Sequence, residues 1–420
     1  MNYNFFKNYN IFLLFFTLYL SLVVGFYFDE NLNYGAIPDW SHTDFPVIKD
    51  LSVDTKKTLL DYEIYGHRHS PVYLIFLSLF RRIGFSFEAI RFLHLNISLL
   101  LIYFFYKCLL LKFDNVEKNI LLVLSLSIFL SPTFRSLAIW PSSRLIGLIF
   151  FVISSYEFLK FLNKPKKVYM WKNIIFLIIS SYISPNFSLF IIFFLFHYLK
   201  KVTFKDLLVI SLFCFVSSIP AFYYIFVLDV NFLLATTPGM DKSQTISLSF
   251  NLSDKILIIS SILFFHLIPF LIDNRFIKSF IKPQKRDVLI VGVFLIINLF
   301  FFGYSINFTG GGVFFQLSNL FFENNYFFYL VSFISLMLIA NFSKNSFSNF
   351  LIFILIIISN IQNTIYHKYY DPLIMILFFT LINNSLSYDF FKYRNKVFYV
   401  YIFYFIYISM RIIKNNYFNL

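Results

Sequence analysis

The stretch IFLLFFTLYLSLVVGFYF at residues 11–28 is followed directly by the polar segment DENLNYGAIPDW at residues 29–40. An uncharged run of this length approaches the roughly 20 apolar residues that a helix needs to cross a bilayer. No small-residue cleavage site precedes Asp29, so we expect an uncleaved first spanning helix. Apolar runs of about 15 to 25 residues, separated by short polar breaks, continue along the chain and predict many spanning helices.

The composition supports this prediction. Of 420 residues, 59% are apolar and 13% are charged, whereas soluble domains carry roughly 25% charged residues. We therefore predict an all-α polytopic membrane protein and exclude a soluble enzyme or a nucleic-acid-binding domain. The net charge of +14 comes from small basic groups between the apolar runs, which are typical topology signals. Cys108 and Cys214 lie inside apolar runs, so no disulfide framework is expected.

Whether residues 71–83 cross the membrane decides on which side each later loop lies. As a helix this run is roughly 20 Å long, too short for a hydrocarbon core of about 30 Å, so we interpret it as an interfacial helix. The basic groups Lys164 to Lys172 and Lys278 to Arg286 then fall in cytoplasmic turns, as the positive-inside rule favours. The spans after the first helix are expected at residues 88–110, 119–134, 143–160, 173–184, 186–199, 207–228, 255–272, 288–304, 325–340, 348–362, 372–386 and 397–413, which makes 13 in all.

We expect a single integral membrane domain over residues 1–420. Residues 29–87 form a long acidic first outer loop that includes the interfacial helix, residues 88–228 the core helices, and residues 229–420 a variable set of C-terminal helices. A loop of this length is usually functional. The spans contain almost no charge, whereas ion-coupled transporters keep ionisable groups near the midplane. This distribution favours a membrane enzyme that works at the outer face.

Five short motifs lie at the outer ends of the predicted helices. They are Asp29-Glu30-Asn31-Leu32-Asn33-Tyr34, His69-Ser70-Pro71-Val72-Tyr73, Glu88-Ala89-Ile90-Arg91, Pro141-Ser142-Ser143-Arg144 and His367-Lys368-Tyr369-Tyr370-Asp371-Pro372. In this order they resemble motifs of the GT-C superfamily of glycosyltransferases, particularly the branch of bacterial aminoarabinose and protein mannosyl transferases. The acidic motif has one residue more than the Asp-Glu-x-x-Tyr pattern that it resembles. Ser70 stands where the family's His-Pro-Pro motif has its first proline.

The resemblance implies an enzyme that transfers a hexosyl or pentosyl unit from a polyprenyl-phosphate donor to an envelope lipid, glycan or protein. It also implies a bacterial inner membrane protein with its active site on the periplasmic face, serving glycan biosynthesis in the cell envelope. The implied partners are the polyprenyl-phosphate-linked sugar and membrane lipids, with no nucleic acid. The resemblance does not identify the sugar or the acceptor.

The chemistry of such a transfer also follows from the residues. A lipid-phosphate-linked sugar carries its own leaving group, so the enzyme needs a base for the acceptor and positive charge for the departing phosphate. Asp39 is the first candidate for the base because Pro38 stiffens its backbone. Asp29 is the second candidate, with Glu30 beside it. Trp40 is a candidate for stacking on the sugar.

Cations would bind the donor phosphate, since arginine grips a phosphate through two parallel hydrogen bonds and lysine supplies a compact charge. The candidates are Arg144, Lys368, His69, Arg91 and Arg135, with Tyr369 as a further sugar contact. His67 and His69, together with the loop acids, form a candidate site for a divalent cation such as Mg²⁺ or Mn²⁺. Each of these residues also has a structural interpretation, as a solvated loop acid, a helix cap or a cation at lipid headgroups.

Two other functions are compatible with an outer-face membrane protein. An oligosaccharide polymerase or ligase is the main alternative, but its key residues normally lie in a large late loop, whereas the longest loop here is the first. A lipid or polysaccharide transporter is less favoured, because the predicted spans lack a polar path.

Overall fold

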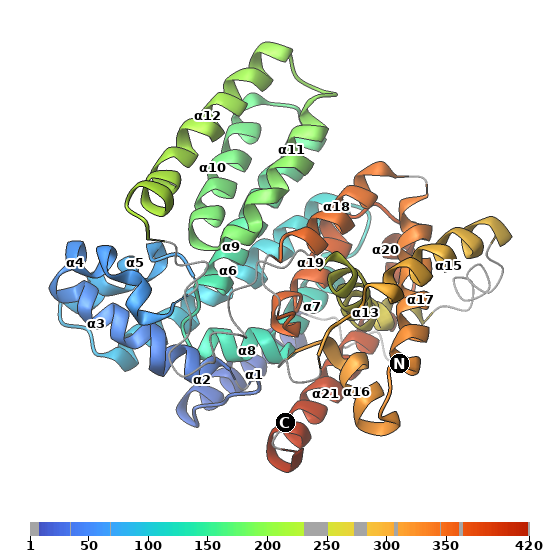
Figure 1. The fold of residues 1–420 in the computed structure, drawn as a ribbon, viewed down its shortest axis with the longest axis horizontal. Coiled ribbons are helices and arrows are strands. Elements are labelled where there is room, and N and C mark those ends of the chain that lie inside the picture. Colours follow the sequence, from blue (N-terminus) through green and yellow to red (C-terminus); the bar gives the residue numbers. More distant parts are fainter. Residues whose placement is uncertain are drawn as a thin grey trace. The chain divides into compact units, whose positions relative to one another are not determined.

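The protein is described here by a computed structural model over residues 8–33, 35–67, 69–230, 251–272, 284–305, 310–344, 346–360 and 364–418. Within these ranges all regular elements are helices, as the sequence predicts (Figure 1). The chain divides into two compact units, Met1–Ile246 with Tyr404–Leu420, and Ser247–Phe403. A single membrane domain over residues 1–420 stays a prediction.

The first unit begins with a long helix, continues with the short helices of the first loop, and then forms a set of long helices. Its elements are α1 (Asn8–Tyr27), α2 (Ala36–Pro38), η1 (Asp39–Asp44), α3 (Phe45–Val53), α4 (Thr55–Leu60), η2 (Tyr62–Tyr65), α5 (Val72–Arg82), α6 (Phe87–Lys112), α7 (Lys118–Leu126), η3 (Ser127–Leu130), α8 (Pro132–Ile139), α9 (Ser143–Asn163), α10 (Lys167–Ile183), η4 (Pro185–Phe190), α11 (Ile191–Tyr198), α12 (Phe204–Phe222) and η5 (Tyr223–Val227). The last helix, α21 (Lys396–Ile413), and η9 (Lys414–Phe418) end the chain.

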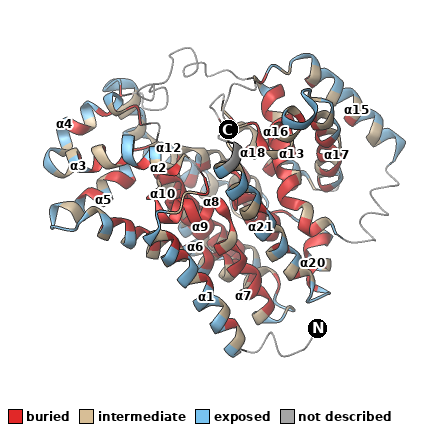
Figure 2. Ribbon diagram, turned by 90° about the horizontal axis from the view of Figure 1, so that it is seen from below, coloured by how far each residue is buried: buried red, intermediate tan, exposed pale blue. Residues whose placement is uncertain are grey.

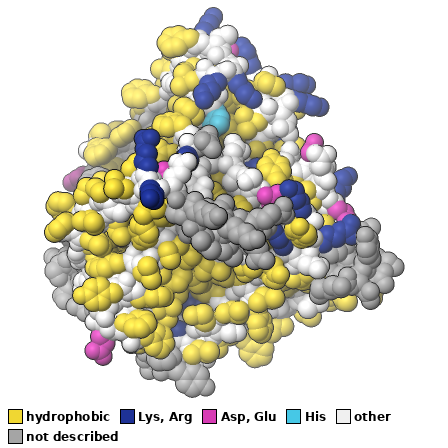
Figure 3. Space-filling view, turned by 90° about the vertical axis from the view of Figure 1, so that its right-hand side faces the viewer, with side chains coloured by type: hydrophobic (Ala, Val, Ile, Leu, Met, Phe, Trp, Pro, Cys, Tyr) yellow, Lys and Arg dark blue, Asp and Glu magenta, His cyan; other side chains and the backbone are white. Residues whose placement is uncertain are grey.

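Burial separates central from peripheral helices in this unit. In the most apolar 18-residue stretch of α9, 78% of the residues are buried, whereas only 6% are buried in the corresponding stretch of the helix over Phe204–Val227. Figure 2 shows buried residues along the length of α9 and an alternation of buried and exposed residues along α1. Hydrophobic side chains also cover much of the face in Figure 3. Exposed apolar surface on this scale is typical of helices that face lipid.

Contacts between α1 and α6 show where the chain that contains the short helix α5 begins and ends. The two long helices are antiparallel, because Asp29 at the end of α1 meets Arg91 in α6, while Tyr19 reaches Asn96 further along. The chain between them, including α5, therefore leaves and returns at the same end of the pair. The sequence prediction of an interfacial helix at residues 71–83 requires this arrangement.

Contacts at the opposite end agree with the predicted topology. The side-chain amide of Asn163, at the end of α9, donates to the carbonyl of Leu111 near the end of α6 (3.1 Å). The lysine-rich connection from α9 to α10 begins there, on the side away from the acidic loop. The second predicted basic turn, Lys278 to Arg286, lies largely outside the described residues.

The predicted number of spans is not confirmed within the described residues. Seven helices are long and apolar enough to cross a membrane, or nine if each of two bent pairs counts as one span. The predicted span at 119–134 ends early because Ser131 caps α8 through the Phe134 amide, and Pro132 starts a helix bent by 67°. Three other apolar helices, Pro185–Tyr198, Gly312–Phe322 and Phe347–Ile358, have only 10–17 residues. Thirteen spans therefore remain a prediction.

The second unit is a smaller group of helices. Its elements are α13 (Leu252–Leu271), α15 (Lys285–Phe300), α16 (Gly312–Phe322), α17 (Tyr326–Ser343), α18 (Phe347–Ile358), η8 (His367–Tyr369), α19 (Leu373–Thr380) and α20 (Ser385–Phe391). Helix α17 packs against α13, α15, α16 and α18. Phe270 of α13 stacks on Phe378 of α19 with ring centroids 5.0 Å apart.

The end of the chain returns to the end of α1. The Asn415 side-chain amide donates to the carbonyl oxygens of Asn31 (3.1 Å) and Leu32 (3.5 Å). Helices α1 and α21 thus both end at the same place. If both cross the membrane, the chain crosses it an odd number of times, and a total of 13 spans stays a prediction.

This arrangement predicts the labelling of single cysteines in a chain in which Cys108 and Cys214 are first replaced by Ala. An impermeant maleimide added to intact cells should label Lys56→Cys and Asn416→Cys, because both positions are exposed and lie on the side of the acidic loop. Lys166→Cys should react only after permeabilisation. Labelling of positions 56 and 416 from opposite sides would show that α1 and α21 do not end together.

Candidate active site

The acid that ends the first helix is held by an arginine from α6. Asp29 has a left-handed backbone (φ 50°), which is unfavourable for residues other than glycine. Its Oδ1 accepts a hydrogen bond from Arg91 Nη2 (2.7 Å). The Arg91 guanidinium lies 3.7 Å from the centroid of the Trp140 ring and 5.0 Å from that of Phe26. The cation is therefore fixed by aromatic faces as well as by the carboxylate.

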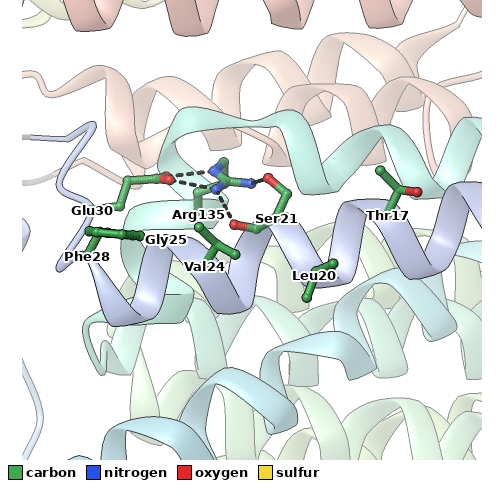
Figure 4. A pocket seen from close by; sticks show the side chains of 8 residues that line it. All are labelled: Thr17, Leu20, Ser21, Val24, Gly25, Phe28, Glu30 and Arg135. Carbon is green, nitrogen blue, oxygen red and sulfur yellow. Dashed lines mark hydrogen bonds and ion pairs between the residues drawn. The ribbon is translucent and has the colours of Figure 1, made fainter.

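The neighbouring acid forms a second and more enclosed pair. Glu30 accepts two hydrogen bonds from Arg135 of α8, Nε to Oε1 and Nη2 to Oε2, both 2.6 Å. Arg135 also donates to the hydroxyl and the carbonyl of Ser21 in α1 (3.1 and 3.0 Å) (Figure 4). The Trp140 indole donates to the Glu30 carbonyl (3.0 Å). A bidentate pair of this kind fixes geometry as well as charge.

The two acids differ in what they can still contact. The Glu30 side chain is 21% exposed, and both of its carboxylate oxygens bind Arg135. The Asp29 side chain is 60% exposed, and within the described residues only its Oδ1 has a hydrogen-bond partner. Asp29 can therefore meet a substrate, whereas Glu30 holds the segment in place.

An open groove runs along α1 beside the Glu30–Arg135 pair (Figure 4). Its volume is about 670 Å³. The lining residues are Thr17, Leu20, Ser21, Val24, Gly25, Phe28, Glu30 and Arg135. Glu30, Arg135 and Ser21 lie toward one end of the groove and Thr17 toward the other, with the apolar Leu20 between them (Figure 4).

The first-choice base of the sequence analysis lies elsewhere in the first loop. Asp39 is exposed at the start of η1. Trp40 beside it is 6% exposed and packs edge-on against Phe45 and Phe87, with ring centroids 6.3 and 6.4 Å away. Stacking of Trp40 on a sugar stays a prediction, and it would require one of these rings to move.

A buried polar network that the sequence did not reveal joins the first loop. His67 Nε2 is hydrogen-bonded to Asp44 Oδ1, and its Nδ1 lies 2.9 Å from the Tyr62 hydroxyl. That hydroxyl donates to the His69 carbonyl (2.8 Å). Asp44, Tyr62 and His67 are all buried. Asp44 and Tyr62 carry no local pattern that sets them apart from the other polar residues of the loop.

These contacts weigh against the predicted divalent-cation site. Both ring nitrogens of His67 already contact protein groups. Among the described residues, no group of three or more His, Cys, Asp or Glu side chains is placed to hold a metal ion. A divalent cation at His67 and His69 therefore stays a prediction, and no chemical step is assigned to it.

A further buried contact links α5 to the helices behind it. His94 of α6 is hydrogen-bonded to the Tyr73 hydroxyl of α5 through Nδ1, and its Nε2 lies 2.7 Å from the Leu137 carbonyl of α8. His94 was assigned no role from the sequence. It positions α5 against the two helices that carry Arg91 and Arg135.

The remaining phosphate and sugar candidates are spread over both units. Arg144 lies buried in the first turn of α9, and His69 is half-buried with its ring 5.4 Å from that of His67. Lys368 and Tyr369 belong to η8 of the second unit and are half-buried. Tyr34, the last residue of the acidic motif, lies outside the described residues.

The second unit contains its own buried histidine contact. Nε2 of His367, next to Lys368, lies 2.7 Å from Nε2 of His266 in α13. Asp371 is also buried. Sequence analysis assigned His266 no role, because a lone histidine in an apolar run carries no signal of its partner.

The His67 network predicts a pH dependence of stability. Burial lowers the pKa of His67, but the charge and hydrogen bond of Asp44 outweigh burial and raise this pKa above its ordinary value. The stabilisation is complete below the unfolded pKa of about 6.5 and is lost as the pH rises through the folded pKa. Thermal unfolding between pH 5.5 and 8.5 should show this decline, and His67→Gln should remove it. An unchanged pH profile in His67→Gln would assign the dependence to other groups.

Gly25 predicts a second stability difference. A Cβ at this position would lie 2.6 Å from Glu30 Oε2 and 3.1 Å from Arg135 Nη2. Gly292 of α15 is the matched control, since a Cβ there meets nothing within 4 Å. Gly292→Ala should stabilise by about 0.5–1 kcal/mol, whereas Gly25→Ala should destabilise in the same thermal unfolding assay. Equal stabilisation by both changes would mean that the Glu30–Arg135 pair is loosely held.

Comparison with known proteins assigns no family. The chain matches no family model, no curated protein and no solved structure. The interpretation of the site therefore depends on the contacts of its own residues.

Proposed function

We propose that the chain is a membrane glycosyltransferase that moves a sugar from a polyprenyl-phosphate donor to an acceptor at the outer face of the membrane. The observation that supports this proposal most is the exposed carboxylate of Asp29. It lies at the end of an apolar helix, oriented by Arg91 and held in an unfavourable backbone conformation.

The reaction needs few groups from the protein. The acceptor hydroxyl or amine gives its proton to a carboxylate, attacks the anomeric carbon, and the bond from that carbon to the phosphate oxygen breaks. Positive character develops on the sugar, as in glycoside hydrolysis. In this proposal Asp29 Oδ2 takes the acceptor proton, while Arg91 holds Oδ1 and so aims the carboxylate.

The other residues take supporting roles in the proposal. Glu30 and Arg135 anchor the acidic segment to α1 and α8, so neither is assigned to the reacting groups. Arg144 and His69 of the first unit remain the proposed contacts of the donor phosphate, and the role of Lys368 stays a prediction from the sequence. Asp39 becomes the second choice for the base, because Asp29 is oriented by Arg91 at the end of α1, whereas Asp39 lies exposed in η1.

Other features of the proposal rest on the sequence resemblance to the GT-C superfamily. These are a bacterial inner membrane location, a periplasmic active site and an envelope lipid, glycan or protein as acceptor. An oligosaccharide polymerase or ligase stays the alternative, since it would also be a membrane enzyme of the outer face.

Replacement of Asp29 tests the proposal directly. Asn keeps the size of Asp but has no useful basicity, so Asp29→Asn should lower turnover by about 10²–10⁴-fold with expression intact. The measurement is release of polyprenyl phosphate from defined polyprenyl-phosphate sugars by the purified chain. Asp61→Asn, an exposed acid of the same loop, is the matched control and should keep the normal rate.

The remaining outcomes separate the candidates. Loss of turnover in Asp39→Asn with a normal Asp29→Asn enzyme would transfer the role of base to Asp39. Normal rates in both variants would contradict the mechanism and move the polymerase alternative ahead. Glu30→Gln should lower the unfolding temperature, because it breaks a largely buried ion pair.

A further inference from the structure

The C-terminal end of α21 meets the acidic segment after α1. Asn415 donates to the carbonyl oxygens of Asn31 and Leu32, residues that directly follow Glu30. This contact joins residues 384 positions apart. It brings the basic end of α21, with Arg411 and Lys414, to the segment that carries Asp29.

Two buried donors without partners flank this contact. Asn33, which follows Leu32, is 8% exposed, and its Nδ2 has no hydrogen-bond partner in the described part of the chain. The Nε of Arg411, one helical turn before Asn415, is also buried and lacks a partner there. Native proteins rarely leave such donors unsatisfied, because each costs about 1–3 kcal/mol. A polar group from outside the chain can supply such an acceptor.

The charges around the contact favour an anion as that acceptor. Arg411 forms no ion pair with a carboxylate of the described residues; its guanidinium lies 5.8 Å from the Tyr407 ring centroid. Lys414 is three residues further, and residues at this spacing are neighbours on a helix surface. Like charges at this spacing repel each other, so the two cations together attract an anion. A phosphate offers both negative charge and several acceptor oxygens.

The position in the chain indicates what carries the phosphate. Arg411 and Lys414 lie at the end of Lys396–Asn416, a segment long and apolar enough to cross a membrane. The end of such a helix lies at the depth of lipid headgroups. We propose that Asn33, Arg411 and Lys414 form a binding site for a phosphate group carried by a lipid.

Two lipids would present this chemistry. A polyprenyl phosphate would place the leaving group of the proposed reaction next to the segment of Asp29, an interpretation that rests on the proposed function. An anionic phospholipid would instead anchor the end of α21 at the headgroups. Binding is measured without sugar transfer, so this inference and the proposed function can fail separately.

The test uses the full chain in phosphatidylcholine nanodiscs. Polyprenyl phosphate or phosphatidylglycerol is added, and the rise in unfolding temperature gives the affinity of each. Arg411→Gln and Lys414→Gln should each weaken binding of at least one of these lipids by about tenfold or more, as expected when a charge-assisted hydrogen bond is lost. Arg411→Lys, which keeps the charge, should weaken it less. Lys56→Gln, an exposed lysine of the first loop, is the control and should bind as the unchanged chain does.

The outcomes assign the ligand or overturn the site. Weakening confined to polyprenyl phosphate identifies the donor lipid, and weakening confined to phosphatidylglycerol identifies a bilayer lipid. If Arg411→Gln fails to fold, Lys414→Gln alone decides, because its side chain lies beyond the end of α21. Unchanged affinity for both lipids in the folded variants would show that the site does not exist.

Discussion

Two pairs of carboxylate and guanidinium groups connect the end of α1 to the rest of the first unit. Asp29 binds Arg91 of α6, and Glu30 binds Arg135 of α8. Because both arginines are buried among apolar helices, each has few places where its charge can be compensated. The pairs therefore fix the direction of α1 relative to α6. That direction in turn keeps both ends of the first loop on one side.

The same pairs divide two adjacent acids into different roles. Glu30 is enclosed and saturated by Arg135, with Gly25 leaving room for the pair against α1. Asp29 turns outward through a left-handed backbone and keeps one carboxylate oxygen without a partner among the described residues. A rigid acid beside an exposed one is a suitable arrangement for a surface reaction, since the rigid pair keeps the exposed carboxylate in position.

The sequence predicted the helical class and the short helix at residues 71–83. Its spans at 119–134 and 372–386 are each divided between two helices that meet at a sharp bend. The predicted run at 119–134 is interrupted because a cap at Ser131 and the fixed backbone of Pro132 end one helix and begin another. Hydropathy measures only the apolar content of a window, so it does not detect a bend inside an apolar run.

Apolar length and local caps are properties of neighbouring residues, and the sequence alone determined them for this protein. It also named Asp29, Glu30, Arg91 and Arg135 as site residues, but gave the arginines to a phosphate rather than to the acids. Their pairing joins residues 62 and 105 positions apart. A buried charge needs a partner, but burial does not specify which residue supplies it. The packing of the helices decides which partner each charge meets. Only the tertiary structure decided that the arginines hold the acids and that Asp44, Tyr62 and His67 form one network.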